Sequence, residues 1–286
     1  MKLIKPSFEV IDQQADLDGI YRQIELAGRT CYKSENLITE TSAKEFVDRM
    51  IVSGHGAMLE HGTVYLYIAD SWSHSDIFYK YTSNKYSRVK FERSSEAVDN
   101  KMYITTNLRV LVENNWLDDL QYICEPTEYH EKRVTVKFIC DRGVLCEFTR
   151  HRVFSFAAES TRYCNYSKDK FGNELTFILP CWIDEVLHNN IMNMLKDDKL
   201  EIIPTSEYYV LLKNSESTYF QLLAEGWQPQ QARSVLPNSL KTELVMTGFV
   251  SDWEHFFKLR CAQSAHPQAR ELAVPLEEYF KQNNIL

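Results

Sequence analysis

The sequence is short of the features by which many proteins bind nucleotides through their backbone. Its 286 residues include only nine glycines, and neither GxGxxG nor GxxxxGK[ST] occurs. Both motifs cradle phosphate with glycine-rich backbone, so a Rossmann turn or a P-loop is not expected. If this protein binds phosphate, arginine side chains must supply the donors.

Cysteine pairs and membrane signals are also missing. The seven cysteines are odd in number and contain no CxxC pair, which argues against a disulfide framework or a structural zinc site. The first residues lack the apolar stretch of a signal peptide, and no apolar run approaches the length of a membrane span. We therefore expect a cytoplasmic protein without a membrane partner.

Positive charge is scarce, because 32 basic side chains face 40 acidic ones and leave a net charge of −8. Nucleic acid and anionic membranes attract basic faces, so neither is an expected partner. An anionic ligand would need a local basic pocket. Apolar residues make up 44% of the chain, which is enough for a sizeable core in one large domain or two small ones.

One basic stretch reverses this charge balance. Residues 150–163 hold three arginines and one histidine, and their only acid is Glu159. Arginines this close repel one another unless an anion lies between them, and the guanidinium fork suits phosphate and carboxylate. Structural ion pairs are the simpler interpretation of such a cluster. A site for a phosphorylated ligand is the sharper one.

Hydrophobic periodicity predicts a mixture of helices and strands. Strands are expected at residues 7–11, 63–69, 88–91, 102–106, 134–140 and 242–250. Helices are expected at residues 17–28, 43–51, 108–120, 142–151, 187–195, 217–224, 228–237, 252–260 and from 266 onward, with the last bent or broken at Pro275. Residues 29–32 are expected to form a turn, residues 153–159 a loop, and residues 70–101 a largely irregular segment.

Polar residues mark the expected beginnings of three helices. The pairs Ser42/Glu45 and Ser251/Glu254 have the spacing of capping boxes. Asp141 is expected to cap the helix that leads into the basic stretch. The C-terminal end of that helix would favour the cations that gather there, because the helix dipole is negative at this end.

Nucleophilic catalysis finds little support in the sequence. Cys146 and Cys164 flank the basic stretch, but nothing supplies a Cys-His-Asn arrangement, so small buried side chains are the simpler interpretation. Ser155 and Ser160 lack a GxSxG setting. Hydroxyl groups that hydrogen-bond an anion are the better interpretation of these two serines.

A metal site is also poorly supported. His55, Glu60 and His61 do not have HExxH spacing. A glycine turn at residues 54–56 with a hydrogen-bonded His55 is the commoner outcome, and a histidine that contacts a ligand is the alternative. A metal-dependent hydrolase built on His55, His61 and His151 is a remote alternative.

The spacing within residues 150–163 reads Arg-His-Arg, seven residues, Ser, one residue, Arg-Tyr, and it resembles the signature of the flavin-dependent thymidylate synthases. Further similarity follows at residues 29–32, 54–55, 60–61, 232–237, 253–260 and 266–268. The resemblance implies an α+β fold with a mixed or antiparallel sheet and packed helices. It implies a single domain over residues 1–286 with an insertion at about 70–130, assembled as a homotetramer whose sites are shared between subunits.

The resemblance also implies the reductive methylation of dUMP to dTMP. Methylenetetrahydrofolate would supply the carbon, and NADPH would reduce a bound FAD that passes a hydride to the pyrimidine. No enzyme cysteine and no metal are needed. Arg260 corresponds to the arginine that favours ionisation of the uracil ring, as a fixed cation in a dry site would. His55 falls where a histidine lines the approach of folate and nicotinamide.

The remaining site residues follow from the same resemblance. Contacts to dUMP are implied for Glu147, Arg150, Ala158, Glu159, Ser160, Thr161, Arg162, Arg233 and Arg260. Contacts to the flavin are implied for Ala57, Arg150, His151, Arg152, Phe249, Ser251 and His255.

Five positions depart from the commonest pattern of that family. Ala157 and Ala158 stand where many members have Asn and Glu, Ala57 replaces a hydroxyl residue, Phe249 an asparagine and Glu147 a glutamine. Each change removes or alters one polar contact, on the order of 1 kcal/mol apiece. We expect an active enzyme with altered flavin contacts. The alternative is a non-catalytic nucleotide-binding homologue that has lost tight flavin binding.

Overall fold

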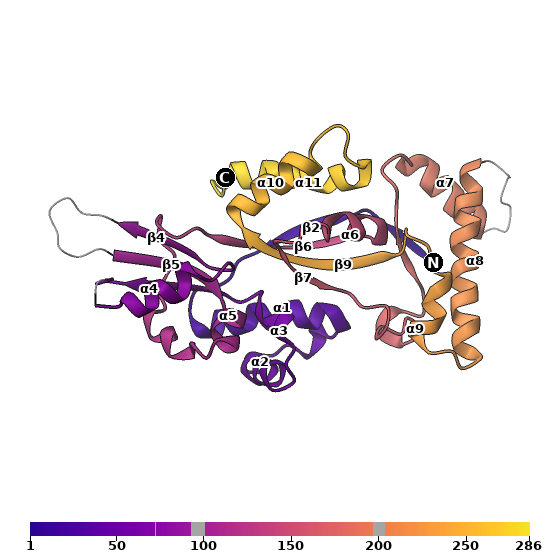
Figure 1. The fold of residues 1–286 in the computed structure, drawn as a ribbon. Helices are drawn as coiled ribbons and strands as arrows, with labels where there is room; N and C mark the ends of the chain where they lie inside the picture. The colour runs from indigo at the N-terminus through magenta and orange to yellow at the C-terminus, as the bar shows by residue number, and fades with distance from the viewer. Residues whose placement is uncertain (72, 93–100, 197–203) are drawn as a thin grey trace.

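The computed structural model describes residues 1–71, 73–92, 101–196 and 204–286. The molecule is elongated, with a central sheet in the middle, a second sheet at one end and a group of helices at the other (Figure 1). Three hydrophobic clusters correspond to these three parts. None of the helices in the described ranges combines the length and apolar character needed to cross a membrane.

The central sheet has four antiparallel strands in the order β2-β6-β9-β7. They are β2 (Ser7–Ile11), β6 (Arg133–Asp141), β9 (Lys241–Phe249) and β7 (Ser155–Ala158). The register pairs Val136 with Met246 and Phe138 with Leu244, so these four apolar side chains lie on one face. The expected strands at 7–11, 134–140 and 242–250 are confirmed to within one residue.

Three helices cover this apolar face: α6 (Arg142–Phe148), α10 (Val250–Arg260) and α11 (Pro267–Gln282). Asp141 caps α6 as expected, because its Oδ1 accepts a hydrogen bond from the Val144 amide at 2.7 Å. The expectation that Pro275 would break the last helix is wrong. Leu272 and Leu276 are buried on either side of Pro275, and their packing keeps the helix continuous past the proline.

The opposite face of the central sheet packs on α1 (Leu17–Tyr32) and α3 (Gly56–Leu59), with α2 (Ser42–Val52) packed on both. The predicted end of α1 near Gly28 is wrong, and residues 29–32 are helical rather than a turn. Gly28 is a packing residue instead, since a Cβ at that position would lie 2.4 Å from the ring of Phe46. The helix ends at Tyr32, and its C-cap Lys33 has a φ of 48°.

Both predicted capping boxes are wrong. Ser42 is the first residue of α2 rather than its cap, and its hydroxyl donates to Glu25 Oε2 at 2.8 Å. At α10 it is the carboxylate of Asp252 that accepts from the Phe249 amide, at 3.2 Å. The Ser251 hydroxyl donates to Glu131 at 2.5 Å. In both cases the serine hydroxyl donates to a carboxylate far away in the sequence instead of capping the helix as the local spacing predicted.

The second sheet has the order β3-β5-β4, again antiparallel, with strands β3 (Thr63–Ile68), β5 (Lys101–Asn107) and β4 (Arg88–Glu92). It packs with α4 (Ser75–Thr82), α5 (Leu108–Glu113) and the 3-10 segment η2 (Leu117–Tyr122). Helix α4 lies in the segment expected to be largely irregular, and its buried Ile77 and Tyr81 are one turn apart. The proposed insertion at about 70–130 includes residues 72 and 93–100, which lie outside the described residues.

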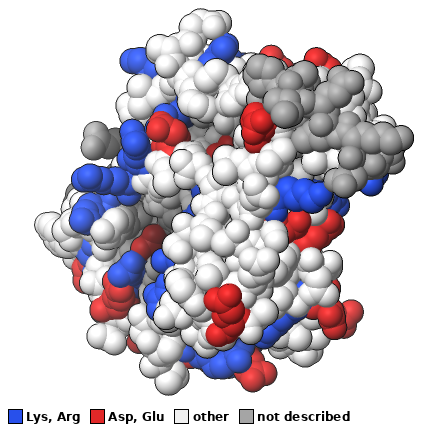
Figure 2. Space-filling model, turned by 90° about the vertical axis from the view of Figure 1, so that its right-hand side faces the viewer, with Lys and Arg blue, Asp and Glu red and all other residues white. Residues whose placement is uncertain are grey.

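The helical end contains α7 (Glu185–Lys196), α8 (Pro204–Ala224), α9 (Pro229–Ala232) and the 3-10 segment η4 (Arg233–Val235). Here β1 (Lys2–Ile4) pairs in parallel with β8 (Thr176–Ile178). Short 3-10 segments η1 (Glu35–Leu37) and η3 (Asp169–Phe171) complete the order. Figure 2 shows the face over α8, where uncharged residues form a broad area with charged residues mainly at its edge. The fold is therefore mixed α and β, with two antiparallel sheets and packed helices.

Candidate functional site

The basic stretch at 150–163 connects α6 to β7 and then leaves the central sheet. Helix α6 ends at Phe148, so Arg150 and His151 lie in the turn beyond it rather than on the helix. Residues 155–158 form a strand instead of the expected loop, because β7 pairs with β9 along its whole length. This pairing gives the stretch a fixed position against the sheet.

Alternation along β7 decides where its two alanines point. Ala157 is buried against Ala27 of α1 and Val245 of β9. Ala158 is half-buried and packs on the opposite face. A larger polar side chain at Ala157 would have to enter the contact between α1 and the sheet. The small residue there therefore has a packing reason that the sequence did not reveal.

Three predicted site residues meet in what we call the Arg260 cluster: Arg260, Glu147 and His151. Arg260, the last residue of α10, donates through Nη1 to Glu147 Oε2 at 2.6 Å and through Nη2 to the Glu147 carbonyl at 2.5 Å. Its Nε donates to His151 Nε2 at 2.9 Å. The guanidinium is therefore fixed on three sides by residues 109 and 113 positions earlier in the chain.

The geometry requires a neutral His151. Since Nε2 accepts from Arg260, the ring proton lies on Nδ1. Burial lowers the pKa of His151 to about 4, and the nearby charges of Arg260 and His255 act in the same direction. His255 is exposed, with its ring centroid 6.2 Å from that of His151. Arg150 is exposed too, and its Nη1 lies 3.6 Å from Glu147 Oε1.

A second group of predicted residues lines what we call the Arg142–Arg233 pocket, of about 440 Å³. Arg233 Nη1 donates to Thr161 Oγ1 at 3.2 Å, which joins η4 to the end of the basic stretch. The Ser160 hydroxyl oxygen accepts a hydrogen bond from the Arg162 amide at 3.3 Å. The exposed Arg162 guanidinium lies 5.2 Å from the centre of the Tyr163 ring. Arg142 was not among the predicted site residues.

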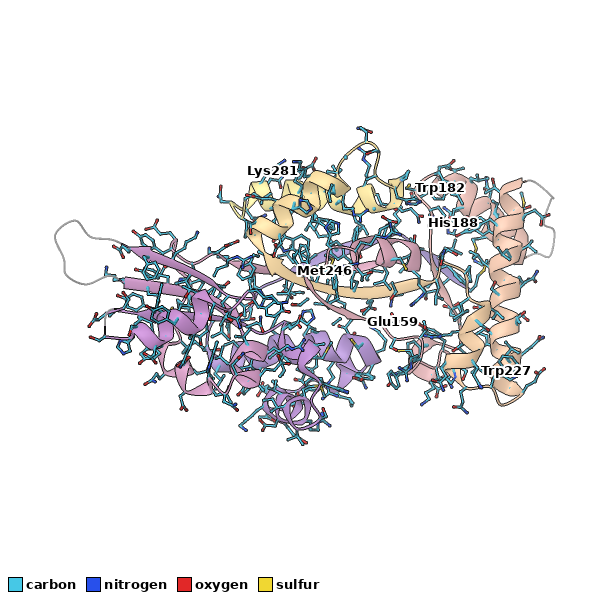
Figure 3. All side chains as sticks on the ribbon, in the orientation of Figure 1. Glu159, Trp182, His188, Trp227, Met246 and Lys281 are labelled. Atoms are coloured by element: carbon cyan, nitrogen blue, oxygen red, sulfur yellow. The ribbon has the colours of Figure 1, made fainter. Side chains whose placement is uncertain are left out.

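Glu159 is turned into the protein. Its carboxylate accepts from the Tyr166 hydroxyl at 2.8 Å and from Lys241 Nζ at 2.9 Å, and the residue is only 3% exposed. Glu159, labelled in Figure 3, lies between the central sheet and the α9 end of the molecule. Its side chain therefore anchors the segment that follows it and is not available to a ligand.

Lys241 also belongs to what we call the Glu243 cluster, formed by Glu243, Lys33, Lys137 and Lys241. The Glu243 carboxylate lies 2.8 Å from Lys33 Nζ, 2.7 Å from Lys137 Nζ and 2.5 Å from Lys241 Nζ. Burial alone would raise the pKa of Glu243, but the three lysines overcome it and lower that pKa to about 2. The cluster joins α1, β6 and β9 beneath the basic stretch.

Arg152 and Phe249 line a larger cavity of about 620 Å³, which we call the Arg133 pocket. Its lining contains five basic residues against three acidic ones, an excess of positive charge in an acidic chain. The basic residues are Lys85, Arg88, Arg109, Arg133 and Arg152. Four of these five were missed, because their approach to Arg152 depends on long-range packing between the two sheets.

The Phe249 ring in the lining of this pocket lies near two guanidiniums. Arg88 Cζ lies 4.5 Å and Arg133 Cζ 5.6 Å from the centre of the Phe249 ring. Arg133 donates to neutral acceptors, namely the Glu60 carbonyl at 2.9 Å and the Ser155 hydroxyl at 3.2 Å. Burial lowers the pKa of Arg133 to about 10. An enclosed cation with neutral partners favours an anionic ligand.

The remaining predicted residues are not brought into these groups. Ala57 lies in α3 and His55 precedes it, both exposed. Ser251 is bonded to Glu131, as described above. His61 is buried, with its Nδ1 2.8 Å from Thr247 Oγ1. His55, His61 and His151 thus have separate surroundings, and the described residues contain no group of three or more His, Cys, Asp or Glu placed to hold a metal ion.

All seven cysteines are free thiols. Cys164 is buried, and burial raises its pKa to about 12. Cys31 is half-buried, and burial raises its pKa to about 11. Neither forms a thiolate readily near neutral pH. Cys146 is exposed at the end of α6.

Comparison with known proteins identifies the family. The model of the thymidylate synthase complementing protein family matches residues 126–283, just over half of the chain. The chain belongs to this family. The matched segment contains the Arg260 cluster and the whole basic stretch, so the relationship suggested by the signature is confirmed.

Curated relatives match over similar lengths. A flavin-dependent thymidylate synthase from Synechocystis sp. is 28% identical over 154 residues, which cover 51% of this chain and 65% of the relative. One from Pyrococcus horikoshii is 31% identical over 147 residues, which cover 51% of this chain and 54% of the relative. The chain spans about half to two thirds of the length of these relatives.

Solved structures also match. The crystal structure of a UMP/dUMP methylase, PolB from Streptomyces cacaoi bound with 5-Br dUMP, is 16% identical to this chain. The alignment covers 99% of this chain and 93% of that one, with a TM-score of 0.43.

Proposed function

We propose that this protein is a flavin-dependent thymidylate synthase, a methyltransferase that converts dUMP to dTMP. Methylenetetrahydrofolate would donate the carbon and NADPH the reducing equivalents. The observation that carries the proposal is the Arg260 cluster, in which an immobilised guanidinium lies between Glu147 and a neutral His151. Such a cation stabilises negative charge that develops on a uracil ring without needing to reorganise.

The Arg133 pocket fits a flavin dinucleotide. Its volume of about 620 Å³ and its excess of basic residues suit a large ligand that carries a diphosphate. Phe249 and Arg152 would hold the cofactor, with Arg133 as a fixed cation beneath it. When bound, the flavin supplies the hydride. The protein's part is to orient the pyrimidine, to hold Arg260 in place and to keep His151 unprotonated.

The nucleotide would lie against the end of the basic stretch. Arg233 and Thr161 share a hydrogen bond and line the same pocket, which supports both as ligands of the phosphate. Ser160 and Arg162 are adjacent to them in the chain. Glu159 would contribute by holding this segment through Lys241 and Tyr166.

A visible spectrum and a tritium-release assay test the proposal. The purified protein should be yellow and should release FAD on denaturation. It should liberate tritium from dUMP labelled at ring carbon five only when NADPH and the folate are both present. Arg260→Gln should keep the flavin and lose at least 100-fold in tritium release. A colourless protein that cannot be reconstituted with FAD would rule the proposal out.

A non-catalytic nucleotide-binding homologue is the second candidate. Phe249 favours it, because its ring is covered by Arg88 and offers no amide to a flavin. Calorimetry separates the two functions. Binding of dUMP that is unaffected by FAD supports the non-catalytic homologue, whereas dependence on FAD supports the enzyme.

A homotetramer with shared sites is part of the proposal. Arg150, Arg152 and Arg162 are exposed in the single chain, so a second chain that packs on this surface would contact them. Mixing two inactive variants, Arg162→Gln and Arg260→Gln, should restore activity if one site takes residues from two chains. No recovery in mixed oligomers would show that each chain supplies both residues of its own site.

A further inference from the structure

We infer that Arg142 is a second phosphate-binding arginine, which grips the phosphate of the nucleotide together with Arg233. The inference rests on the proposed function for the identity of the nucleotide. Its own basis is the chemistry of the Arg142–Arg233 pocket, and the ligand class it requires is a phosphate monoester.

Arg142 carries an unused donor. Its Nη1 is buried and has no hydrogen-bond partner among the described residues. The nearest acid in sequence, Asp141, is already engaged by the Val144 amide at 2.7 Å and by Gln268 Nε2 at 2.6 Å. A buried charged donor without a partner is costly, so such a group points to an acceptor that the chain itself does not supply.

The described residues that line the pocket around Arg142 include no acid. Its lining combines the two arginines with the hydroxyl residues Thr161 and Ser234, the amide of Gln230 and two leucines. Neither guanidinium forms an ion pair with a carboxylate in the described part of the chain. The Arg133 pocket differs, because three acidic residues offset part of its positive charge. Two guanidiniums without an acid favour a dianion, which a phosphate monoester becomes near neutral pH.

The backbone holds the two arginines in one frame. The Arg142 amide donates to the Asn238 carbonyl at 2.8 Å, which ties the beginning of α6 to the segment that follows η4. Arg233 is fixed separately by its bond to Thr161. The pocket is therefore assembled before a ligand arrives, and little ordering is needed when a phosphate enters.

Calorimetry with the full-length protein tests the inference through a ligand pair. Arg142→Gln should weaken the binding of dUMP by at least 30-fold and leave the binding of deoxyuridine, which has no phosphate, unchanged. Arg22→Gln is the matched control, because Arg22 is an exposed arginine whose ion pair is with the exposed Asp18. This control should bind both ligands as the wild type does.

Two results would overturn the inference. One is dUMP binding by Arg142→Gln that equals the wild type. The other is a loss of the same factor for dUMP and deoxyuridine, which would indicate a structural role. If Arg142→Gln does not fold, Arg142→Lys tests the inference instead, because lysine keeps the positive charge but lacks the paired donors of the guanidinium. Its ratio of dUMP to deoxyuridine affinity should fall at least threefold, and an unchanged ratio overturns the inference.

The same measurements keep this inference apart from the proposed function. If the wild-type protein binds dUMP no better than deoxyuridine, the proposed nucleotide site itself is refuted. If the wild type prefers dUMP and releases tritium while Arg142→Gln binds dUMP as the wild type does, the proposed function stands. Only the phosphate-binding role of Arg142 is then refuted.

Discussion

The charged residues of this protein occupy two contrasting surroundings. In the Glu243 cluster and the Arg260 cluster, every charge named has an opposite charge or a hydrogen-bond acceptor from the same chain. In the Arg142–Arg233 pocket, two guanidiniums share a cavity with no acid among the described residues of its lining. Charges that are paired within the chain build and orient the site. Charges left unpaired in a cavity are available to a ligand, so the two kinds should respond differently to mutation.

The largest effect is expected at the centre of the Glu243 cluster. Glu243→Gln would leave three lysines around a neutral group, and we expect a loss of about 3–5 kcal/mol in the free energy of unfolding, measured with urea. Glu185→Gln is the control, because Glu185 pairs with Lys5 where both side chains are 67% exposed. That pair should contribute little to stability, because solvent screens an ion pair that is this exposed. Equal losses in the two variants would contradict the contrast.

Arg233 should show the opposite pattern. Arg233→Gln removes a charge-assisted contact to phosphate, so dUMP affinity should fall by about 2–3 kcal/mol, or roughly 30- to 150-fold. The free energy of unfolding should stay within about 0.5 kcal/mol of the wild type, because the guanidinium has no acidic partner to lose. Calorimetry and urea unfolding of one preparation measure both. A stability loss as large as the affinity loss would place Arg233 among the paired charges.

The paired Arg260 cluster should respond to pH through His151. The pKa of this imidazole falls from 6.5 to about 4 on folding, so between these values the unfolded chain binds more protons. Stability from this group is therefore present above pH 6.5 and lost as the pH falls toward 4, on the order of 3 kcal/mol. His151→Gln should lose less stability than the wild type over this range, whereas His55→Gln, at an exposed histidine, should follow the wild type. Parallel curves for wild type and His151→Gln would disprove the coupling.

The smallest effect is expected at Glu147. Glu147→Gln removes the carboxylate bond to Arg260 but leaves the backbone carbonyl bond and the bond to His151 in place. We expect a loss of about 1 kcal/mol in the free energy of unfolding, since one of three contacts is weakened. A loss of more than about 3 kcal/mol would mean that the carboxylate alone holds the guanidinium.

Local signals in the sequence predicted the fold where the cause is local. Alternation placed β6 and β9 to within one residue, and Asp141 was found as a cap because its acceptor lies three residues from the amide it bonds. Strand β7 was missed, because four residues without a turn signal become a strand only by pairing with β9. The prediction that α1 ends at Gly28 was wrong for a similar reason, because this glycine allows close packing against Phe46 and does not end the helix.

The site was predicted in the same uneven way. The signature contains His151, and the wider family resemblance added Glu147 and Arg260; the structure brings these three residues into direct contact. Arg133 and Arg142 were missed, because what distinguishes them is the lack of an acidic partner, and no local pattern reports the lack of a partner in space. The inward turn of the Glu159 carboxylate was missed too, since its partner Lys241 is 82 residues away.

Strand β9 has a consequence for how activity should depend on protein concentration. Its beginning adjoins Leu240 in the Arg142–Arg233 pocket, and its end is Phe249 in the Arg133 pocket. Eight steps along a strand span about 26 Å. If the phosphate binds in one pocket and the flavin ring in the other, a single chain holds them too far apart for a hydride to pass. Turnover would then need pockets from different chains. Dilution that separates the chains should therefore abolish activity while every chain stays folded.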